Sequence, residues 1–374
     1  MRLVWAVSCL AVSCCLAGSA AAAPPQVDAR AWMVENPVTG EVLLTHAARE
    51  RVPIASITKL MTVIVALQHL NLNEVVGVDP RAAAVGQETI YLEARQQITV
   101  SDLVKAALIQ SANDAADALA LATAPSFPDF ALLMNAEARK LGLTDSHFVR
   151  PDGLDAAGEY SSARDVTRLA IAAMKIPTVR AAVDEVTVTI ENGSRELHTW
   201  DDLLGVVPGV FGVKTGHTSA AGWNQVSAIR GDDTTIYATI LGSPSRAQRN
   251  TDLETLLIYG IAQYRQVRAI AAGRRYAAVN LPFGRPPLAL VARLGLQAVV
   301  RVNEPLTERV VAPISVSLPV RLGQVLGQVE VWSRGRLLGR RPLVASRTVP
   351  APGLAGRIAW YARRTVHEVV DLLT

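Results

Sequence analysis

The sequence predicts an α+β fold followed by a smaller β-rich domain. Two short segments with strand-like patterns come first, a block of helical patterns follows, and strand patterns return from residue 186. Strands and helices that are separated along the chain in this way are typical of α+β proteins. After residue 269 the helical periodicity ends, and short alternating segments between Gly and Pro turns indicate a second domain built from strands.

Residues 1–22 have the pattern of a secretory signal peptide. Arg2 precedes an apolar run over residues 3–17, and the small residues that follow end at Pro24. We expect cleavage after Ala22, since a cut one residue later would place a proline directly past the scissile bond. An uncleaved membrane anchor is the alternative, but the apolar run is short for a membrane span. The mature protein is therefore expected to be exported.

All three cysteines of the chain, Cys9, Cys14 and Cys15, lie in this signal segment. The mature chain is thus expected to have no disulfide, no thiol nucleophile and no Cys-ligated zinc. No metal and no cofactor is predicted. No later stretch reaches the ~18 consecutive apolar residues of a transmembrane helix.

Charge is distributed unevenly along the 374 residues, whose net charge is +4. Residues 1–264 carry 20 Lys and Arg against 28 Asp and Glu, whereas residues 265–374 carry 17 Arg, no Lys and 5 acidic residues. Such an asymmetry indicates two parts with different surroundings. For an exported protein, anionic lipid headgroups are the expected partner of the basic part, and nucleic acid is not.

The elements of the first domain, residues 23–265, follow from local patterns. Strands are expected at 31–34 and 41–45, and an amphipathic helix is expected from Ser56 to about Leu70. Residues 71–95 are expected to be irregular, with strand-like fragments, and Ser101-Asp102 and Ser162 are expected to start helices. The other expected elements are helices at 103–109, 114–122, 128–141, 163–175 and 245–262, and strands at 186–190, 210–218, 223–229 and 234–241.

The β-rich domain is expected to span residues 266–349. Its expected strands are 277–281, 288–293, 297–302, 316–319 and 325–332. A Pro-Ala-Pro-Gly linker at 350–353 then leads to a helix over 354–373, whose apolar side chains share one side. Such a helix can lie in a membrane interface, with Trp360 at its edge. Docking of the helix on its own β-domain or in a dimer is the alternative.

Ser56 and Lys59 form the first candidate for a catalytic pair. The serine lies where the first helix begins, and Lys59 follows three residues later, so both side chains share one helix face. A serine hydroxyl is a weak nucleophile unless a base takes its proton, and a lysine with a lowered pKa can be that base. The helix N-terminus also favours an oxyanion. Ser-x-x-Lys alone is common by chance, so the motif needs support.

Ser111-Ala112-Asn113 separates two of the expected helices. At such a junction the polar side chains are free to point into a cleft. Ordinary helix capping is the alternative explanation, because Ser and Asn are common where helices start and stop.

Lys214-Thr215-Gly216 lies in an expected strand. Glycine weakens a strand and often marks the close approach of another backbone or a ligand. The lysine supplies a fixed positive charge, and the threonine hydroxyl can bind a carboxylate. Because the chain has only five lysines, a chance Lys-Thr-Gly is unusual.

Together, Ser56-Ile57-Thr58-Lys59, Ser111-Ala112-Asn113 and Lys214-Thr215-Gly216 form an ordered triplet. It resembles the active-site signature of penicillin-binding proteins and serine β-lactamases. The chain is most similar to the low-molecular-mass D-alanyl-D-alanine carboxypeptidases, the S11 serine peptidases, over roughly residues 28–265. The resemblance implies an antiparallel sheet flanked by helices, a helical lobe that carries Ser111 and Asn113, and a comparable C-terminal region.

Four residues depart from the usual pattern of that family. Ala112 replaces a Gly, Arg150 an Asn, Phe211 an Asp and Trp223 a Tyr. None of them is one of the residues to which the family assigns catalysis, so they bear on specificity rather than on the reaction class.

The resemblance also implies a reaction, the hydrolysis of peptidoglycan stem peptides that end in D-Ala-D-Ala. Ser56 would attack the carbonyl between the two D-alanines, and Lys59, kept neutral by burial and by the nearby cation Lys214, would accept its proton. Ser111 would relay a proton to the departing D-alanine, held by Lys214. Asn113 would hold the substrate's side-chain amide.

The same resemblance assigns the binding groups. The backbone N–H groups of Ser56 and His217 would form the oxyanion hole, Thr215 would bind the terminal carboxylate, and Gly216–His217 would pair with the peptide backbone. β-Lactams would be covalent inhibitors. The C-terminal helix would attach the protein to the outer face of the cytoplasmic membrane, on the periplasmic side.

Three other functions remain open from the sequence. A β-lactamase shares the triplet, but no Glu-x-x-Leu-Asn segment lies between Asn113 and Lys214. A D,D-endopeptidase acting on crosslinks is closer, although the resembling proteins usually lack the β-domain and anchor. A receptor that binds β-lactams or peptidoglycan without turnover is the third.

Overall fold

The computed structural model describes residues 5–10, 24–231, 234–358, 360 and 362. The chain divides into two compact units, Ala22–Gln263 and Tyr264–Thr374, and the second also includes Met1–Ala21. Each unit has a hydrophobic core of its own.

The first unit is built on a five-stranded antiparallel sheet in the order β3-β2-β10-β9-β8. All five strands of this sheet were expected from the sequence, and each is at least as long as expected. They are β2 (Ala31–Asn36), β3 (Glu41–His46), β8 (Val210–Thr218), β9 (Gly222–Gly231) and β10 (Thr234–Ser243). Because β8 is the last strand in this order, one of its edges faces away from the sheet.

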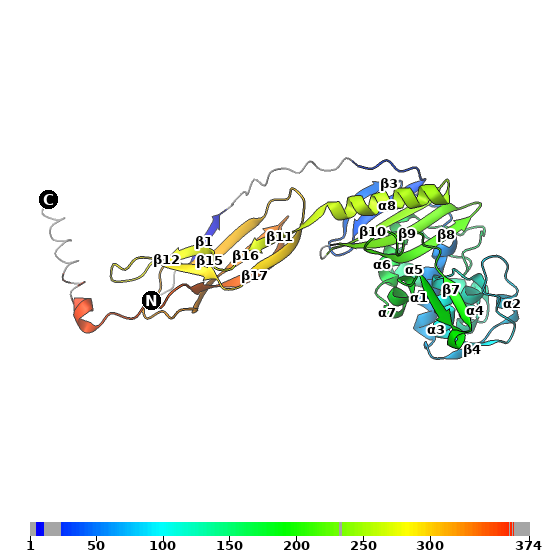
Figure 1. Cartoon of the computed structure of the whole chain (residues 1–374), viewed down its shortest axis with the longest axis horizontal. Helices are drawn as coiled ribbons and strands as arrows, with labels where there is room; N and C mark the ends of the chain where they lie inside the picture. The colour runs from blue at the N-terminus through cyan, green and yellow to red at the C-terminus, as the bar shows by residue number, and fades with distance from the viewer. Residues whose placement is uncertain (1–4, 11–23, 232–233, 359, 361, 363–374) are drawn as a thin grey trace. The chain divides into compact units, whose positions relative to one another are not determined.

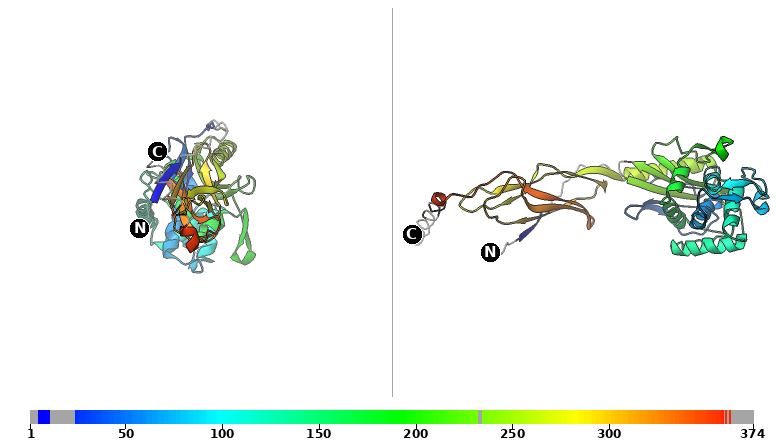
Figure 2. Two further views of the ribbon diagram at one scale, coloured as in Figure 1. Left: turned by 90° about the vertical axis from the view of Figure 1, so that its left-hand side faces the viewer. Right: turned by 90° about the horizontal axis from the view of Figure 1, so that it is seen from below.

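Helices cover both faces of this sheet (Figures 1 and 2). Helix α8 (Arg246–Ala262) packs on β9, β10 and β2 from one side, and α6 (Ala163–Ala173) packs on β10 and β2 from the other. The remaining helices of the unit lie on the same side as α6 (Figure 1). They are η1 (Ala55–Thr58), α1 (Lys59–His69), α2 (Pro80–Ala83), α3 (Val100–Leu108), α4 (Asn113–Thr123), α5 (Phe127–Lys140) and α7 (Pro177–Val183). Two small antiparallel strand pairs complete the unit, β4 (Val75–Gly77) with β5 (Gln97–Thr99) and β6 (Thr187–Ile190) with β7 (Arg195–His198).

Helix α1 is more buried than its sequence suggests. An amphipathic helix was expected, but Lys59 and the seven residues after it are all buried. The reason is that α1 contacts α3, α4, α5 and α6, so neighbouring helices surround it. This environment places the Lys59 amine out of reach of bulk water.

Serine caps set the start of two helices as expected. Ser162 accepts a hydrogen bond from the backbone of Asp165 at the start of α6, and Ser245 accepts one from Gln248 at the start of α8. The expected cap of α3 at Ser101-Asp102 is wrong. Thr99 accepts the bond from the Asp102 backbone instead, so α3 begins at Val100.

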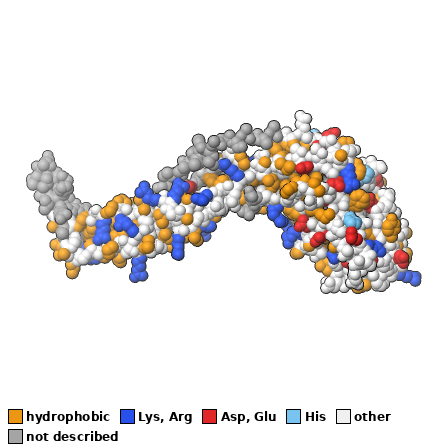
Figure 3. Space-filling view, in the orientation of Figure 1, with side chains coloured by type: hydrophobic (Ala, Val, Ile, Leu, Met, Phe, Trp, Pro, Cys, Tyr) orange, Lys and Arg blue, Asp and Glu red, His pale blue; other side chains and the backbone are white. Residues whose placement is uncertain are grey.

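The second unit is a β-domain with a six-stranded antiparallel sheet in the order β1-β15-β16-β17-β13-β12, and the pair β11-β14 beside it. Its strands are β11 (Tyr264–Ile270), β12 (Arg275–Val279), β13 (Leu288–Ala292), β14 (Leu296–Arg301), β15 (Thr307–Pro313), β16 (Val325–Ser333) and β17 (Arg336–Ala345). The strand expected at 316–319 is wrong, since only single bridges at Ser315 and Val320 flank it. Basic side chains are spread over the face of this unit seen in Figure 3.

The two ends of the chain are described only in part. The expected signal segment lies outside the described residues except for Trp5–Leu10, which forms β1 and pairs with β15. Of the expected C-terminal helix, residues 354–358 are helical, and Leu354 and Ile358 are exposed. The Trp360 ring packs edge-on against Phe283 of the β-domain, with 5.5 Å between ring centroids. In the part of the chain that is described, no helix has the length and apolar character needed to cross a membrane.

Candidate active site

Ser56 lies in the short turn η1, which is held against the edge strand β8. Ala55 adopts a left-handed backbone conformation with φ of 52°, which turns the chain sharply just before the serine. A Cβ atom on Gly216 would lie 2.6 Å from the carbonyl oxygen of Ile54 and 3.1 Å from the Ser56 nitrogen. Only glycine allows this approach, so Gly216 brings the strand and the serine turn together.

The Lys59 amine is the centre of the site. Its side chain is fully buried, and Nζ donates to Ser56 Oγ at 2.8 Å, to Asn113 Oδ1 at 2.7 Å and to the carbonyl of Asp152 at 2.6 Å. An ammonium group has three protons, and here each one has an acceptor. Lys59 therefore connects the serine turn, the start of α4 and the loop at 150–159.

Ser111 and Asn113 meet different lysines. Ser111 has a φ of 63°, and its hydroxyl accepts a hydrogen bond from Lys214 Nζ at 2.9 Å. Asn113, the first residue of α4, accepts from Lys59, and its amide nitrogen donates to the carbonyl of Gly86 at 3.3 Å. Neither side chain caps a helix, because the cap position of α4 is Ala112 and has no side-chain bond. Both polar groups are thus directed into the site.

Strand β8 contributes the second buried lysine. Lys214 is 2% exposed and also donates to the carbonyl of Thr215 at 3.1 Å. Burial, and then the charge of Lys59, lower the pKa of Lys214 well below its usual value. The neighbouring His217 is exposed at the rim, where its ring stacks on Trp223 with 3.9 Å between centroids.

Opposing effects set the pKa of Lys59. Burial lowers this pKa to about 8, whereas the carboxylates of Asp152, Asp117, Glu88 and Glu159 act to raise it. The sequence had indicated burial and Lys214 as the causes. Burial is indeed the largest cause, but Lys214 is not among the main ones, and the acidic groups that oppose burial were not foreseen.

The carboxylates behind Lys59 form a compact network. Asp152 is fully buried and accepts two hydrogen bonds from Arg150, at 2.9 and 2.5 Å. Burial raises the pKa of Asp117 to about 8, and its Oδ1 has no hydrogen-bond partner among the described residues. Burial likewise raises the pKa of Glu159 to about 7, although Thr58 Oγ1 and the Arg150 backbone donate to its carboxylate. Arg150, a departure from the family pattern, is thus the cation that accompanies these acids.

A cavity of about 90 Å³ opens at Ser56. It is lined by Ser56, Glu88, Ser111, Trp200, Thr215, Gly216, His217, Trp223, Arg246 and Arg249. The sequence did not indicate Glu88, Trp200 or the two arginines. Arg249 is 2% exposed, donates to Asp202 at 3.0 Å and lies over the Trp223 ring, but in the sequence it resembles any solvated residue of a helix.

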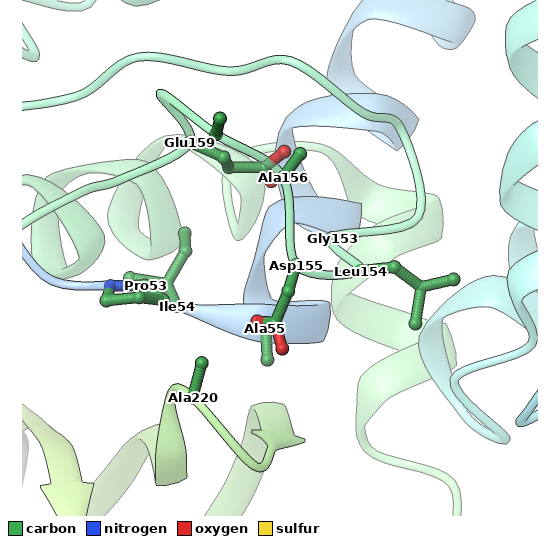
Figure 4. A pocket seen from close by; sticks show the side chains of 10 residues that line it. Pro53, Ile54, Ala55, Gly153, Leu154, Asp155, Ala156, Glu159 and Ala220 are labelled. Carbon is green, nitrogen blue, oxygen red and sulfur yellow. The ribbon is translucent and has the colours of Figure 1, made fainter.

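A second cavity, of about 250 Å³, lies beside the residues that precede Ser56 (Figure 4). Pro53, Ile54 and Ala55 form one wall, and the loop at 153–157 forms another. Thr218 at the end of β8 donates to Asp155 of this loop at 2.7 Å. A Cβ atom on Gly153 would lie 2.2 Å from the carbonyl of Ala55, so this loop rests directly on the serine turn. The described residues contain no group of three His, Cys, Asp or Glu side chains arranged to hold a metal ion.

Comparisons with known proteins show which family the chain resembles. Residues 18–245 match the family model Peptidase_S11, described as D-alanyl-D-alanine carboxypeptidase. D-alanyl-D-alanine carboxypeptidase DacC of Escherichia coli is 32% identical over 369 residues, which cover 92% of this chain and 90% of the relative. A D-alanyl-D-alanine carboxypeptidase of Streptomyces sp. K15 is 32% identical over 258 residues, which cover 64% of this chain and 89% of the relative.

Solved structures extend the similarity to both units. Penicillin binding protein 6B from Escherichia coli has a TM-score of 0.65 and 26% identity, and the match covers 87% of this chain and 98% of that one. Penicillin-Binding Protein D2 from Listeria monocytogenes, solved in its ampicillin-bound form, has a TM-score of 0.59 and 30% identity, and the match covers 64% of this chain and 99% of that one. With a family match over more than half its length and a DacC-like sequence throughout, the chain belongs to the S11 peptidases, the D-alanyl-D-alanine carboxypeptidase family.

Proposed function

We propose that this protein removes the terminal D-alanine from peptidoglycan stem peptides that end in D-Ala-D-Ala, through an acyl-enzyme on Ser56. The observation that carries the proposal is the contact of 2.8 Å between Ser56 Oγ and the buried amine of Lys59. A serine next to a desolvated lysine is an activated nucleophile. The family membership of the chain supports the same reaction.

In the acylation step, Ser56 attacks the carbonyl between the two D-alanines, and neutral Lys59 accepts its proton. The backbone N–H groups of Ser56 and His217 bind the developing oxyanion. Such donors stabilise a transition state by ~3–4 kcal/mol each. Gly216 supports this arrangement, because it lets the strand that carries His217 lie against the Ser56 turn.

The leaving D-alanine needs a proton on its nitrogen. Ser111 supplies it, since its hydroxyl faces the site and is held by Lys214 at 2.9 Å. We assign binding of the substrate's terminal carboxylate to the Thr215 hydroxyl. Arg249, which lines the same cavity, supplies a positive charge that suits this carboxylate.

The acyl half of the substrate extends in the opposite direction along β8. Gly216–His217 pairs with the peptide backbone at the free edge of this strand. Asn113 holds the side-chain amide of the substrate. Water then hydrolyses the ester with Lys59 or Ser111 as the base, which restores Ser56. β-Lactams acylate the same serine and block this cycle.

Release of D-alanine from a pentapeptide ending in D-Ala-D-Ala tests the proposal. The purified protein is expected to release one D-alanine per peptide, and Ser56→Ala is expected to release none while its fold is unchanged by circular dichroism. Release at the wild-type rate by Ser56→Ala would show that another residue is the nucleophile.

We further propose that the protein is exported to the periplasm and attached peripherally to the outer face of the cytoplasmic membrane by its C-terminal helix. The apolar residues Leu354 and Ile358 on one side of that helix are exposed, which suits an interfacial position. Deleting residues 354–374 is expected to move the protein from the membrane fraction to the soluble one. If the shortened protein still pelleted with membranes, the helix would not be the anchor.

A further inference from the structure

A third cavity adjoins the active-site cavity on the side of Ser111, and the reaction above does not use it. Its volume is about 350 Å³. It is lined by Gln87, Glu88, Thr89, Tyr91, Gln110 and Trp200. Glu88 and Trp200 also line the active-site cavity, so the two spaces share a wall and are neighbours.

Hydrogen bonds fix the shared wall to the segment that carries Ser111. The indole nitrogen of Trp200 donates to the carbonyl of Gln110 at 3.0 Å, and the Arg246 guanidinium lies 5.4 Å from the centre of the Trp200 ring. On the other side, the carbonyl of Glu88 accepts a bond of 2.7 Å from the Asn113 backbone. Both wall residues are therefore tied to the residues on either side of Ser111-Ala112.

The orientation of the substrate points the leaving group toward this cavity, an argument that rests on the proposed function. The leaving nitrogen meets Ser111 and the terminal carboxylate meets Thr215. The α-carbon between these two groups carries the side chain of the leaving residue. Past Ser111, that side chain reaches Gln110, Glu88 and Trp200. The methyl group of D-alanine fills little of this space, and a longer side chain has room.

The residues that line the shared wall indicate which side chain of the leaving residue suits this cavity. Glu88 is exposed, and within the described residues its carboxylate has no ion pair and no hydrogen bond. The neighbouring Arg246 forms no ion pair with Glu88, because the Arg246 guanidinium binds Asp202 at 2.7 and 2.5 Å. An indole face and an unpaired carboxylate suit an alkyl chain that ends in an ammonium group.

We propose that this cavity is a leaving-group subsite, which accepts D-amino acids with a long side chain and favours those that end in an ammonium group. The bonds and protons of this reaction balance. The amide C–N bond to the leaving residue breaks, and an ester to Ser56 Oγ forms. Lys59 takes the hydroxyl proton, Ser111 relays a proton from Lys59 to the leaving amine, and water later cleaves the ester and returns a proton to Ser56 Oγ.

Three peptides that differ only in the last residue test the subsite. The acyl half is diacetyl-L-lysyl-D-alanine in each, and the leaving residue is D-alanine, D-norleucine or D-lysine. D-Norleucine and D-lysine share the alkyl chain and differ in the ammonium group. The expected kcat/KM for D-lysine is about threefold to fivefold higher than for D-norleucine, which is the range of a partly exposed ion pair. High salt is expected to reduce this ratio.

Glu88→Gln is expected to bring the ratio of D-lysine to D-norleucine close to one. The charge of Glu88 also acts on the pKa values of Lys59 and Lys214, but that effect is common to all three peptides and cancels in the ratio. Glu93→Gln is the matched control, because Glu93 is an exposed glutamate of the same loop that does not line the cavity, and it is expected to leave the ratio unchanged.

Equal rates for D-lysine and D-norleucine in the wild type would overturn the inference, and so would a preference for D-lysine that survives in Glu88→Gln. These results leave D-alanine release intact, so the proposed function would stand. Failure to cleave all three peptides, D-alanine included, would overturn the proposed function together with the subsite.

Discussion

At the scale of single residues, the proposed mechanism depends on how easily Lys59 loses its proton. The amine has three hydrogen-bond acceptors, which are Ser56 Oγ, Asn113 Oδ1 and the Asp152 carbonyl. These acceptors and the nearby carboxylates stabilise the protonated, charged amine. Complete burial works against the charged form and is the stronger effect, so the pKa of Lys59 falls to about 8. The amine is thus protonated in acid and becomes a competent base in mild alkali.

The pH profile of D-alanine release tests this balance. Because Lys59 acts as a base only when neutral, kcat/KM is expected to rise about tenfold per pH unit in acid and to level off above pH 8, the pKa of about 8 being that of the free enzyme. Lys59→Arg is expected to be inactive throughout, since a guanidinium stays charged. A profile that is flat or falls between pH 6 and pH 8 would contradict the role of Lys59.

Sequence reasoning named Ser56 and Asn113, which contact the Lys59 amine, but not Asp152, which also contacts it, or the buried acids that act on its pKa. Ser56 and Asn113 belong to motifs with a stated chemistry, so their spacing along the chain could indicate them. Asp117 and Glu159 lie in unremarkable segments, and their raised pKa values arise from burial, which depends on the packing of the whole unit. Arg249 is hidden from sequence analysis for the same reason.

At the scale of elements, the site is made by the contact between strand β8 and the turn η1. The strand carries Lys214, Thr215 and His217, the turn carries Ser56, and Gly216 is the point at which they touch. The proposed oxyanion hole uses backbone N–H groups from both elements. Its geometry therefore depends on the absence of a side chain at Gly216.

Gly216→Ala tests this dependence. The added Cβ would lie 2.6 Å from the Ile54 carbonyl, so the strand and the turn must separate. A displacement on this scale is expected to reduce the rate of acylation by fluorescent penicillin about 100-fold. Gly353→Ala is the control, because a Cβ there meets nothing within 4 Å and its rate is expected to be unchanged. Wild-type acylation by Gly216→Ala would mean that the contact is not needed.

Most elements of the first unit were predictable, and the failures have physical reasons. Regular alternation and serine caps located β2, β9, β10, α6 and α8. The start of α3 was misplaced because Thr99 and Ser101 are both capable caps, and only the fold selects between them. In the second unit, strands β11, β15 and β17 were missed because they carry charged residues such as Arg265, Glu308 and Arg340, which weaken the apolar pattern.

At the scale of the whole molecule, the two units have separate cores. The core of the first unit is formed by residues 31–241, and that of the second by residues 269–349. All the residues that line the active-site cavity belong to the first unit. Catalysis is thus expected to be a property of the first unit alone.

A chain of residues 24–263 tests this independence. It is expected to fold, to bind fluorescent penicillin and to release D-alanine with a kcat/KM within about threefold of the full-length protein, because no core residue is lost. The same variant carrying Ser56→Ala provides the blank. If the shortened protein were soluble and folded but unreactive, the β-domain would have to contribute to the site.

The most direct test of the account is to locate the covalent bond to a β-lactam. After reaction with benzylpenicillin and proteolysis, mass spectrometry is expected to find one adduct per chain, on the peptide that contains Ser56, and none in Ser56→Ala. An adduct on any other residue, or D-alanine release by a protein that forms no adduct, would contradict the central claim that Ser56, activated by Lys59, is the nucleophile.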